Sequence, residues 1–173
     1  MRRGAAASPF IPTASAEPDN YLVSFYTAFL KLGCKPSHLS FFKRTPDLKR
    51  YLLNQEVIYV GGGNTKSLLA LWQAWELPAI LRRALAQGTV LCGISAGANC
   101  WFEACSTDSF GLDLDPLLDG LGFLEASFCP HYDGEERRRP TLRQFIGEGR
   151  LPGGWAADNY VGLQFLGTQF VEA

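Results

Sequence analysis

Apolar residues follow two different spacings along the first half of the chain. Between Pro18 and Gly33 they recur every three or four positions, as expected for one buried face of a helix. Elsewhere, short apolar runs bounded by turn residues are typical of buried strands. The pattern predicts a strand that ends at residues 10–11, further strands over residues 39–42, 57–60 and 90–92, and helices over residues 18–32, 46–53, 66–75 and 78–87.

The alternation of these strands and helices is typical of parallel β-α-β units, with helices on both faces of a sheet. In such sheets, ligands bind at the carboxyl ends of the strands. Two glycine-containing turns follow strands there, one beginning at Gly61 and the other at Gly93. We therefore expect a functional site at this edge of the sheet.

The second half of the chain is less regular. Residues 110–122 are rich in Asp and Leu and are predicted to form a loop, whereas residues 123–128 resemble a strand that leads into Cys129-Pro130-His131. Residues 135–146 have helical character except at Pro140. A terminal hairpin is predicted from residues 161–165 and 169–171 around Gly167-Thr168.

Composition narrows the class of protein. With 173 residues, 47% of them hydrophobic and 19% charged, the chain fits one folded domain with a real core. The net charge is −1, which does not favour nucleic-acid binding. No apolar stretch is long enough to span a bilayer. The start, Met1-Arg2-Arg3-Gly4, resembles a signal peptide but lacks its apolar core, so we predict a cytoplasmic protein.

The five cysteines contain no C-x-x-C pair, which favours reduced, mostly buried thiols. A catalytic cysteine stays possible, but nothing in the sequence singles one out. Amidotransferase-like chemistry through Cys92 is a weak alternative, because Cys92 lies inside the predicted strand.

The strongest candidate for chemistry is Ser95. It lies in Gly93-Ile94-Ser95-Ala96-Gly97, which has the G-x-S-x-G spacing of a nucleophile elbow. Small neighbours let the backbone turn tightly there and hold a hydroxyl at the tip. The motif is short, so a plain strand-to-helix turn is the competing interpretation.

A serine nucleophile needs a base, and the chain contains two histidines. His38 lies in a polar connector and is better explained as a surface residue. His131 follows a predicted strand, where side chains project toward a ligand. The carboxylate that orients the base is the least settled part of the site. Asp158, which precedes a predicted strand, is the first candidate. Asp133, Asp113 and Asp115 stay open as alternatives.

Backbone N–H groups could bind the oxyanion of a reaction intermediate. The amide of Ala96 directly follows the candidate nucleophile, and the triple glycine allows a substrate to approach the main chain. A phosphate cradle is the rival interpretation of Gly61-Gly62-Gly63-Asn64-Thr65. It is disfavoured because no Gly-Lys-Ser/Thr follows at P-loop spacing and no G-x-G-x-x-G is present.

Four motifs in this order resemble the peptidase E family of serine peptidases, which includes aspartyl dipeptidases and cyanophycinases. They are Phe10-Ile11-Pro12, Val60-Gly61-Gly62-Gly63-Asn64-Thr65, Gly93-Ile94-Ser95-Ala96-Gly97-Ala98-Asn99 and Pro130-His131-Tyr132. The resemblance implies an α/β fold, a three-layer α/β/α sandwich with a mostly parallel sheet, similar to class I glutamine amidotransferases. It also implies cleavage of dipeptides with an N-terminal aspartate, without a metal or other cofactor.

Carried over by position, the resemblance makes Ser95 the nucleophile, His131 the base and Asp158 the acid. It also implies that the backbone N–H group of Gly62 or Gly63, together with that of Ala96, binds the oxyanion. An arginine after the histidine would bind the substrate carboxylate, because a guanidinium fits a carboxylate with two hydrogen bonds. The segment offers four arginines, and we take Arg138 and Arg139 as the candidates among Arg137, Arg138, Arg139 and Arg143.

The resemblance also shows two departures. Family members begin with a glycine-containing strand that has no equivalent before Phe10, and they usually continue beyond Ala173. We therefore expect residues 1–173 to form a single peptidase E-like catalytic domain that is shortened at both ends. A missing strand would expose a sheet edge, which makes a homodimer possible.

These observations lead to a hypothesis and an alternative. The hypothesis is a serine exopeptidase that hydrolyses dipeptides with an N-terminal aspartate through Ser95, His131 and Asp158. Its partner is then a short acidic peptide, with no nucleic acid and no membrane involved. The alternative is a non-catalytic relative that binds a small acidic ligand or a protein partner in the same pocket.

Overall fold

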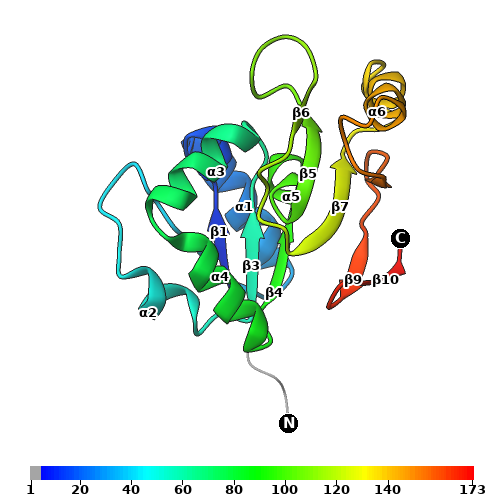
Figure 1. The fold of residues 1–173 in the computed structure, drawn as a ribbon. Helices are drawn as coiled ribbons and strands as arrows, with labels where there is room; N and C mark the ends of the chain where they lie inside the picture. The colour runs from blue at the N-terminus through cyan, green and yellow to red at the C-terminus, as the bar shows by residue number, and fades with distance from the viewer. Residues whose placement is uncertain (1–4) are drawn as a thin grey trace. The chain divides into compact units, whose positions relative to one another are not determined.

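The computed structural model describes residues 5–173, and the basic start of the chain at residues 1–4 lies outside them. The chain divides into two compact units (Figure 1). Unit 1 runs to Gly63 and resumes over Ala70–Gly97, whereas unit 2 contains Asn64–Leu69 and Ala98–Ala173. The chain passes from one unit to the other after Gly63, and again within helices α3 (Thr65–Ala74) and α5 (Ala96–Asn99). The expectation of a single domain stays a prediction.

Unit 1 is built on a four-stranded parallel sheet with the strand order β2-β1-β3-β4. Its strands are β1 (Ala7–Ile11), β2 (Lys35–His38), β3 (Val57–Val60) and β4 (Val90–Gly93). Besides its part of α3, it contains the 3-10 helix η1 (Thr13–Ser15) and helices α1 (Asp19–Lys31), α2 (Leu48–Leu52) and α4 (Leu77–Ala86).

Both faces of this sheet are covered. On one face Phe10 stacks on Phe25 of α1, with 4.5 Å between ring centroids, and Tyr59 packs on the same ring. Side chains alternate across a strand, so Ile58 and Val60 point to the opposite face, and both are fully buried. Figure 1 shows α4 on the viewer's side of the sheet and α1 behind it. A sheet buried on both faces explains the nearly continuous apolar sequence of β3.

Unit 2 contains a mixed sheet with the strand order β6-β5-β7-β8. The strands are β5 (Phe102–Thr107), β6 (Asp115–Leu117), β7 (Leu124–Cys129) and β8 (Gly154–Ala156). β7 runs parallel to β5 and β8, and β6 is antiparallel to β5. Helix α6 (Arg138–Gly147) and the hairpin of β9 (Gln164–Leu166) and β10 (Gln169–Glu172) complete the unit.

Helix α6 closes a small core in unit 2. Its buried residues Leu142 and Phe145 pack with Ala104 of β5, Cys129 of β7 and the following Leu151. Aromatic rings form a second cluster in this unit. Phe102 contacts Phe128 and Phe165, and Trp155 contacts Phe165 and Phe170. The helix thereby fixes the segment that follows β7, which contains His131.

The expected α/β class with mostly parallel strands is confirmed, as are the predicted helices of the first half and the terminal hairpin. Helix α6 begins at Arg138, three residues later than predicted. Pro140 then lies in its first turn, where the missing N–H group of proline costs no helical hydrogen bond. In unit 2 the sequence did not predict β5, β6 or β8.

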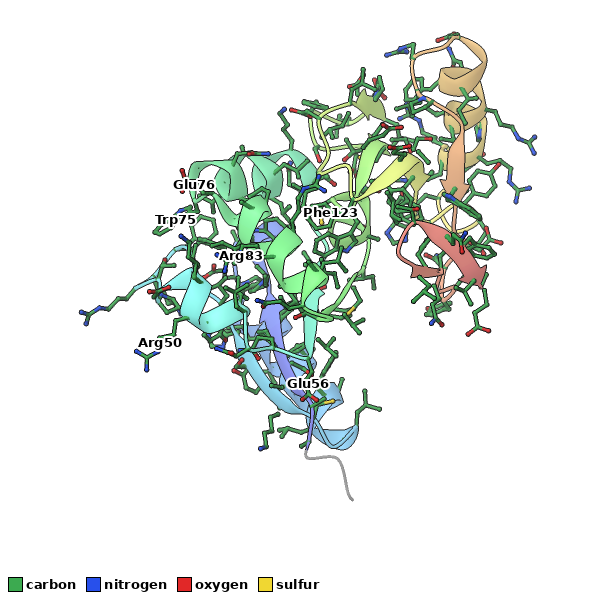
Figure 2. The ribbon with its side chains drawn as sticks, turned by 60° about the horizontal axis from the view of Figure 1, so that its bottom comes forward. Arg50, Glu56, Trp75, Glu76, Arg83 and Phe123 are labelled. Atoms are coloured by element: carbon green, nitrogen blue, oxygen red, sulfur yellow. The ribbon has the colours of Figure 1, made fainter. Side chains whose placement is uncertain are left out.

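The strand predicted over residues 39–42 is wrong. The strand that pairs with β1 in this part of the chain is β2, which lies just before these residues. The last aligned pair of the two strands is Phe10 with His38. After that, the Phe41 N–H group donates to the carboxylate of Glu17 at 2.6 Å, and the Phe41 ring packs against Trp75 (labelled in Figure 2). Leu39 and Phe41 are therefore buried by loop packing rather than by strand pairing, and Phe42 is exposed.

No helix within residues 5–173 combines the length and apolarity that crossing a bilayer requires.

Candidate active site

Ser95 lies at a sharp turn between β4 and α5. Its φ angle is +53°, in the left-handed region that residues with a side chain rarely adopt. Helix α5 begins at the next residue, Ala96. This is the strand–turn–helix context that a nucleophile elbow requires.

Two glycines let the backbone pack closely around this turn inside unit 1. A Cβ atom on Gly62 would lie 3.2 Å from the Ser95 Cβ, so the turn after β3 lies directly beside the serine. A Cβ atom on Gly97 would lie 2.3 Å from the Val60 carbonyl oxygen, which is an impossible contact. The close approach of the carboxyl ends of β3 and β4 therefore requires a glycine at position 97, and Gly62 keeps the neighbouring turn free of a tight contact with Ser95.

The three predicted oxyanion donors all belong to unit 1, but one is already engaged. The Gly62 N–H group donates to the Tyr21 hydroxyl oxygen at 3.0 Å. Gly63 has a φ angle of +135°, and a Cβ atom there would lie 2.2 Å from the Ala14 carbonyl oxygen. Ala96 is the first residue of α5, so its N–H group has no partner within the helix.

The structure disfavours a phosphate cradle, because backbone N–H groups at the start of α3 already have acceptors. Within unit 2 the first N–H groups of α3 are already capped: Ser109 Oγ accepts from Thr65 at 2.9 Å and from Lys66 at 3.3 Å. Asn64 Oδ1 accepts from the Ser67 N–H group at 2.8 Å. Because the start of this helix is capped by side chains, the glycine turn does not present it to a phosphate.

His131 lies directly beyond the end of β7 and, like Ser95, has a left-handed backbone, with a φ angle of +56°. Its ring nitrogen Nδ1 lies 2.7 Å from Oδ1 of Asn159. The Asn159 N–H group in turn donates to the carboxylate of Asp133 at 2.7 Å. All three residues belong to unit 2.

At Nδ1 the structure thus places Asn159, where the sequence led us to expect Asp158. The Asp158 side chain is exposed, and its carbonyl oxygen accepts the Val161 N–H group in a turn that directs the next residue to the imidazole. Asp113 forms an ion pair with Arg137 at 2.6 Å, and Asp115 lies in β6. The sequence signal for Asn159 was only its position next to the expected acid.

The predicted substrate-binding arginines have different environments. The Arg138 side chain is only 4% exposed; its Nε donates to Glu135 at 2.7 Å and its Nη1 to the Ser106 carbonyl oxygen at 3.2 Å. The Arg139 guanidinium lies over the Tyr132 ring, 4.8 Å from its centroid, and the residue is exposed. Arg138 is therefore engaged by the protein, whereas Arg139 faces solvent.

The thiols of Cys92 and Cys105 are poorly suited to nucleophilic chemistry. Burial raises the pKa of Cys92 to about 11, and the Cys92 Sγ lies 3.5 Å from the Ile58 carbonyl oxygen. In unit 2, burial raises the pKa of Cys105 to about 12. Because the thiolate is the nucleophilic form, these cysteines are protonated and unreactive near neutral pH. This disfavours amidotransferase-like chemistry through Cys92.

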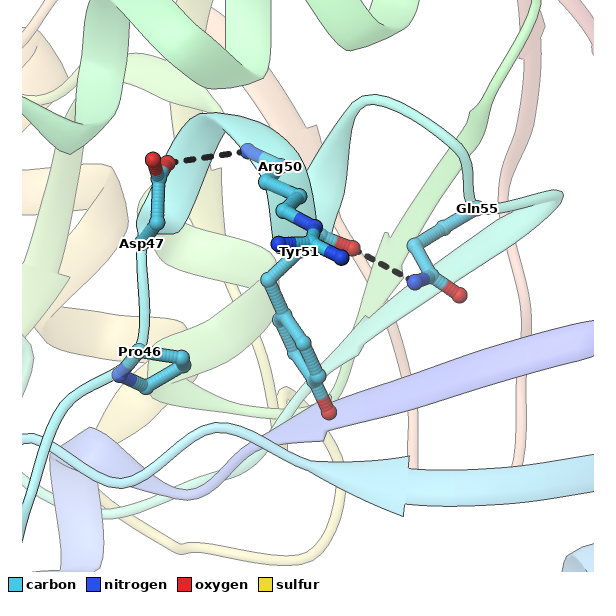
Figure 3. A pocket seen from close by; sticks show the side chains of 5 residues that line it. All are labelled: Pro46, Asp47, Arg50, Tyr51 and Gln55. Atoms are coloured by element: carbon cyan, nitrogen blue, oxygen red, sulfur yellow. Dashed lines mark hydrogen bonds between the residues drawn. The ribbon is translucent and has the colours of Figure 1, made fainter.

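A separate hollow of about 380 Å³ lies beside α2 in unit 1 (Figure 3). Its lining residues are Pro46, Asp47, Arg50, Tyr51 and Gln55, and none is a predicted site residue. The Tyr51 hydroxyl donates to Ser37 Oγ at 2.7 Å, which fixes the ring. Among residues 5–173 no group of three His, Cys, Asp or Glu side chains is arranged to hold a metal ion.

Comparison with known proteins places these features in a family. The model of peptidase family S51 matches residues 2–172. An uncharacterized peptidase of Bacillus subtilis, YgaJ, is 52% identical over 94% of this chain and 70% of its own length. A probable alpha-aspartyl dipeptidase of Drosophila melanogaster is 29% identical over 83% of this chain and 62% of its own length. The relatives support a peptidase function.

A solved structure shares the fold. The "Putative Peptidase E Protein" of Listeria monocytogenes EGD-e matches with a TM-score of 0.77 and 22% identity, over 98% of this chain and 86% of the Listeria chain. This likeness supports the expected three-layer α/β/α class. The chain spans about half the length of the Shewanella peptidase E relatives that it also matches.

The environment of Arg138 predicts a structural role. Arg138→Met should lower the free energy of unfolding by about 1–3 kcal/mol, because the Ser106 carbonyl and Glu135 lose a charged donor. The matched control is Arg143→Met on the exposed face of α6, which should change it by less than about 0.5 kcal/mol. Urea unfolding followed by circular dichroism measures both, and equal effects of the two substitutions would contradict this assignment.

Proposed function

The chain belongs to peptidase family S51, and we propose that it is a serine-type peptidase that hydrolyses short peptides, with Ser95 as its nucleophile. The observation that carries the proposal is the left-handed turn at Ser95, with α5 beginning directly behind it. A strained, glycine-packed turn is costly for a residue without a function, which supports a catalytic serine.

In the proposed reaction, Ser95 Oγ attacks the scissile carbonyl carbon while His131 accepts the hydroxyl proton. The N–H groups of Ala96 and Gly63 stabilise the oxyanion; we prefer Gly63 to Gly62, because Gly62 already donates to Tyr21. The C–N bond then breaks, and His131 returns the proton to the leaving amine. Water hydrolyses the resulting ester of Ser95 by the reverse sequence of proton transfers.

We propose that the substrates are dipeptides with an N-terminal aspartate. The family resemblance and the description of the Drosophila relative support this class. Arg139 is the candidate for binding the aspartate side chain, since it is exposed and its guanidinium is held by the Tyr132 ring. Arg138 is assigned a structural role instead, because its donors are already engaged.

Ser95→Ala should lower kcat on Asp-containing dipeptides by about 10³-fold or more, because no nucleophile remains to form the acyl intermediate. Release of free aspartate measures turnover. The control is Ser24→Ala, which removes an exposed hydroxyl on α1 and should leave the rate unchanged. If Ser95→Ala retains the original rate, the assignment of the nucleophile is wrong. If the folded original chain hydrolyses no peptide, the non-catalytic alternative is favoured.

Arg139→Gln should raise KM for dipeptides with N-terminal aspartate by about tenfold or more, because a charged hydrogen bond to the substrate is lost. Dipeptides with N-terminal alanine should show no such change. Lys49→Gln removes an exposed positive charge on α2 and serves as the control for net charge. A KM increase of the same size for both substrates would contradict the role of Arg139 in specificity.

A further inference from the structure

The segments that follow β7 and β8 are joined beyond the ends of their strands. The Ala157 N–H group donates to the Cys129 carbonyl oxygen at 3.0 Å, and the Tyr132 N–H group donates to the Ala157 carbonyl oxygen at 3.0 Å. These bonds continue the parallel pairing of β7 with β8. They hold His131 and Asn159 side by side at the carboxyl ends of two neighbouring strands.

The chemistry of the amide fixes the roles in the bond between them. The side-chain oxygen Oδ1 of Asn159 can only accept a hydrogen bond, so at 2.7 Å the imidazole nitrogen Nδ1 must carry the proton. In the neutral ring, Nε2 then carries no proton. This is the tautomer that a general base needs when it accepts a serine proton at Nε2.

A glycine makes room for the Asn159 amide. A Cβ atom on Gly134 would lie 1.9 Å from Asn159 Nδ2, so any other residue at position 134 would displace the amide. The backbone of Asn159 is held independently, by its N–H bond to the Asp133 carboxylate. Asp133 therefore holds the backbone of Asn159, and Gly134 leaves room for its amide with Oδ1 directed to the imidazole.

We propose that Asn159 is the positioning residue of His131, and that Gly134 is required for it to act. This inference rests on the proposed function and names the group behind the base. It assigns that place to a neutral amide rather than to Asp158, because Oδ1 of Asn159 is the oxygen that lies 2.7 Å from Nδ1 of His131. The carboxylate of Asp133 acts one step further away, through the backbone of Asn159.

The tautomer of His131 can be measured directly on the folded chain by ¹⁵N NMR of the imidazole nitrogens. His38 is the only other histidine, so the spectrum of the His38→Gln variant shows which signals belong to His131. The Nδ1 atom of His38 lies 2.9 Å from the Tyr26 hydroxyl oxygen. We expect neutral His131 to be protonated at Nδ1. Asn159→Ala should shift the population toward protonation at Nε2, whereas Asn159→Asp retains an acceptor and should restore the original pattern.

The kinetic test separates positioning from substrate binding. Asn159→Ala should lower kcat by about 10²-fold or more and leave KM within about threefold, because the base is misoriented while the substrate site is intact. Asn159→Asp should recover most of kcat. Gly134→Ala should reproduce the loss, and its control is Gly147→Ala, where an added Cβ meets nothing within 4 Å.

The outcomes keep this inference apart from the proposed function. Protonation of neutral His131 at Nε2 in the original chain would overturn it, as would an unchanged spectrum and kcat in Asn159→Ala. If Asn159→Ala does not fold, the inference is tested by the tautomer of His131 in the original chain and by the spectrum and kcat of Asn159→Asp. If the expected tautomer is found but no peptide is hydrolysed, the proposed function fails while the assignment of the imidazole orientation stands.

Discussion

The close approach of the backbone at the carboxyl ends of β3 and β4 is the constraint on which the proposed site depends. Ser95 holds a left-handed conformation there, and Gly62 and Gly97 provide the space for it. Such a conformation costs of order 1–3 kcal/mol and persists only where the surrounding packing enforces it. The fully buried residues Ile58 and Val60 of β3 anchor the neighbouring strand and supply that packing.

Unit 2 also contains a left-handed turn directly after a parallel strand, formed by different residues. His131 also follows a parallel strand and also has a left-handed backbone, and Gly134 provides space for its partner Asn159. Residues at the carboxyl ends of parallel strands are free of the ladder, so the chain can place side chains there without disrupting the sheet. Each unit thus presents one candidate catalytic side chain on a left-handed turn, with a glycine that leaves room for a neighbouring group.

The sequence predicted β3 and β4 of the first half because these two strands are short, apolar and bounded by turn residues. It did not predict β2, whose sequence Lys-Pro-Ser-His is polar. It failed at residues 39–42, where an apolar run packs in a loop and its backbone bonds to Glu17. It also missed β5, whose sequence Phe-Glu-Ala-Cys-Ser-Thr mixes small and polar residues that are nevertheless mostly buried. Burial of polar groups in a sheet depends on partners that sequence spacing does not reveal.

The candidate site was predictable to a similar degree. Ser95 and His131 follow from local motifs, because each lies directly after a strand. The partner of His131 does not, since Asn159 is 28 residues away and the choice between it and Asp158 depends on the turn at residues 158–161. The burial of Arg138 is equally invisible in a run of three arginines, because it depends on contacts with Ser106 and Glu135.

The most direct test of the central claim is covalent labelling of the folded chain with a fluorophosphonate, followed by digestion and mass spectrometry to locate the adduct. This reagent reacts with a serine whose hydroxyl is activated by a neighbouring base. The account predicts a single adduct on Ser95, formed more slowly when a dipeptide with N-terminal aspartate is present in excess. An adduct on another serine, or a folded chain that does not react, would contradict it.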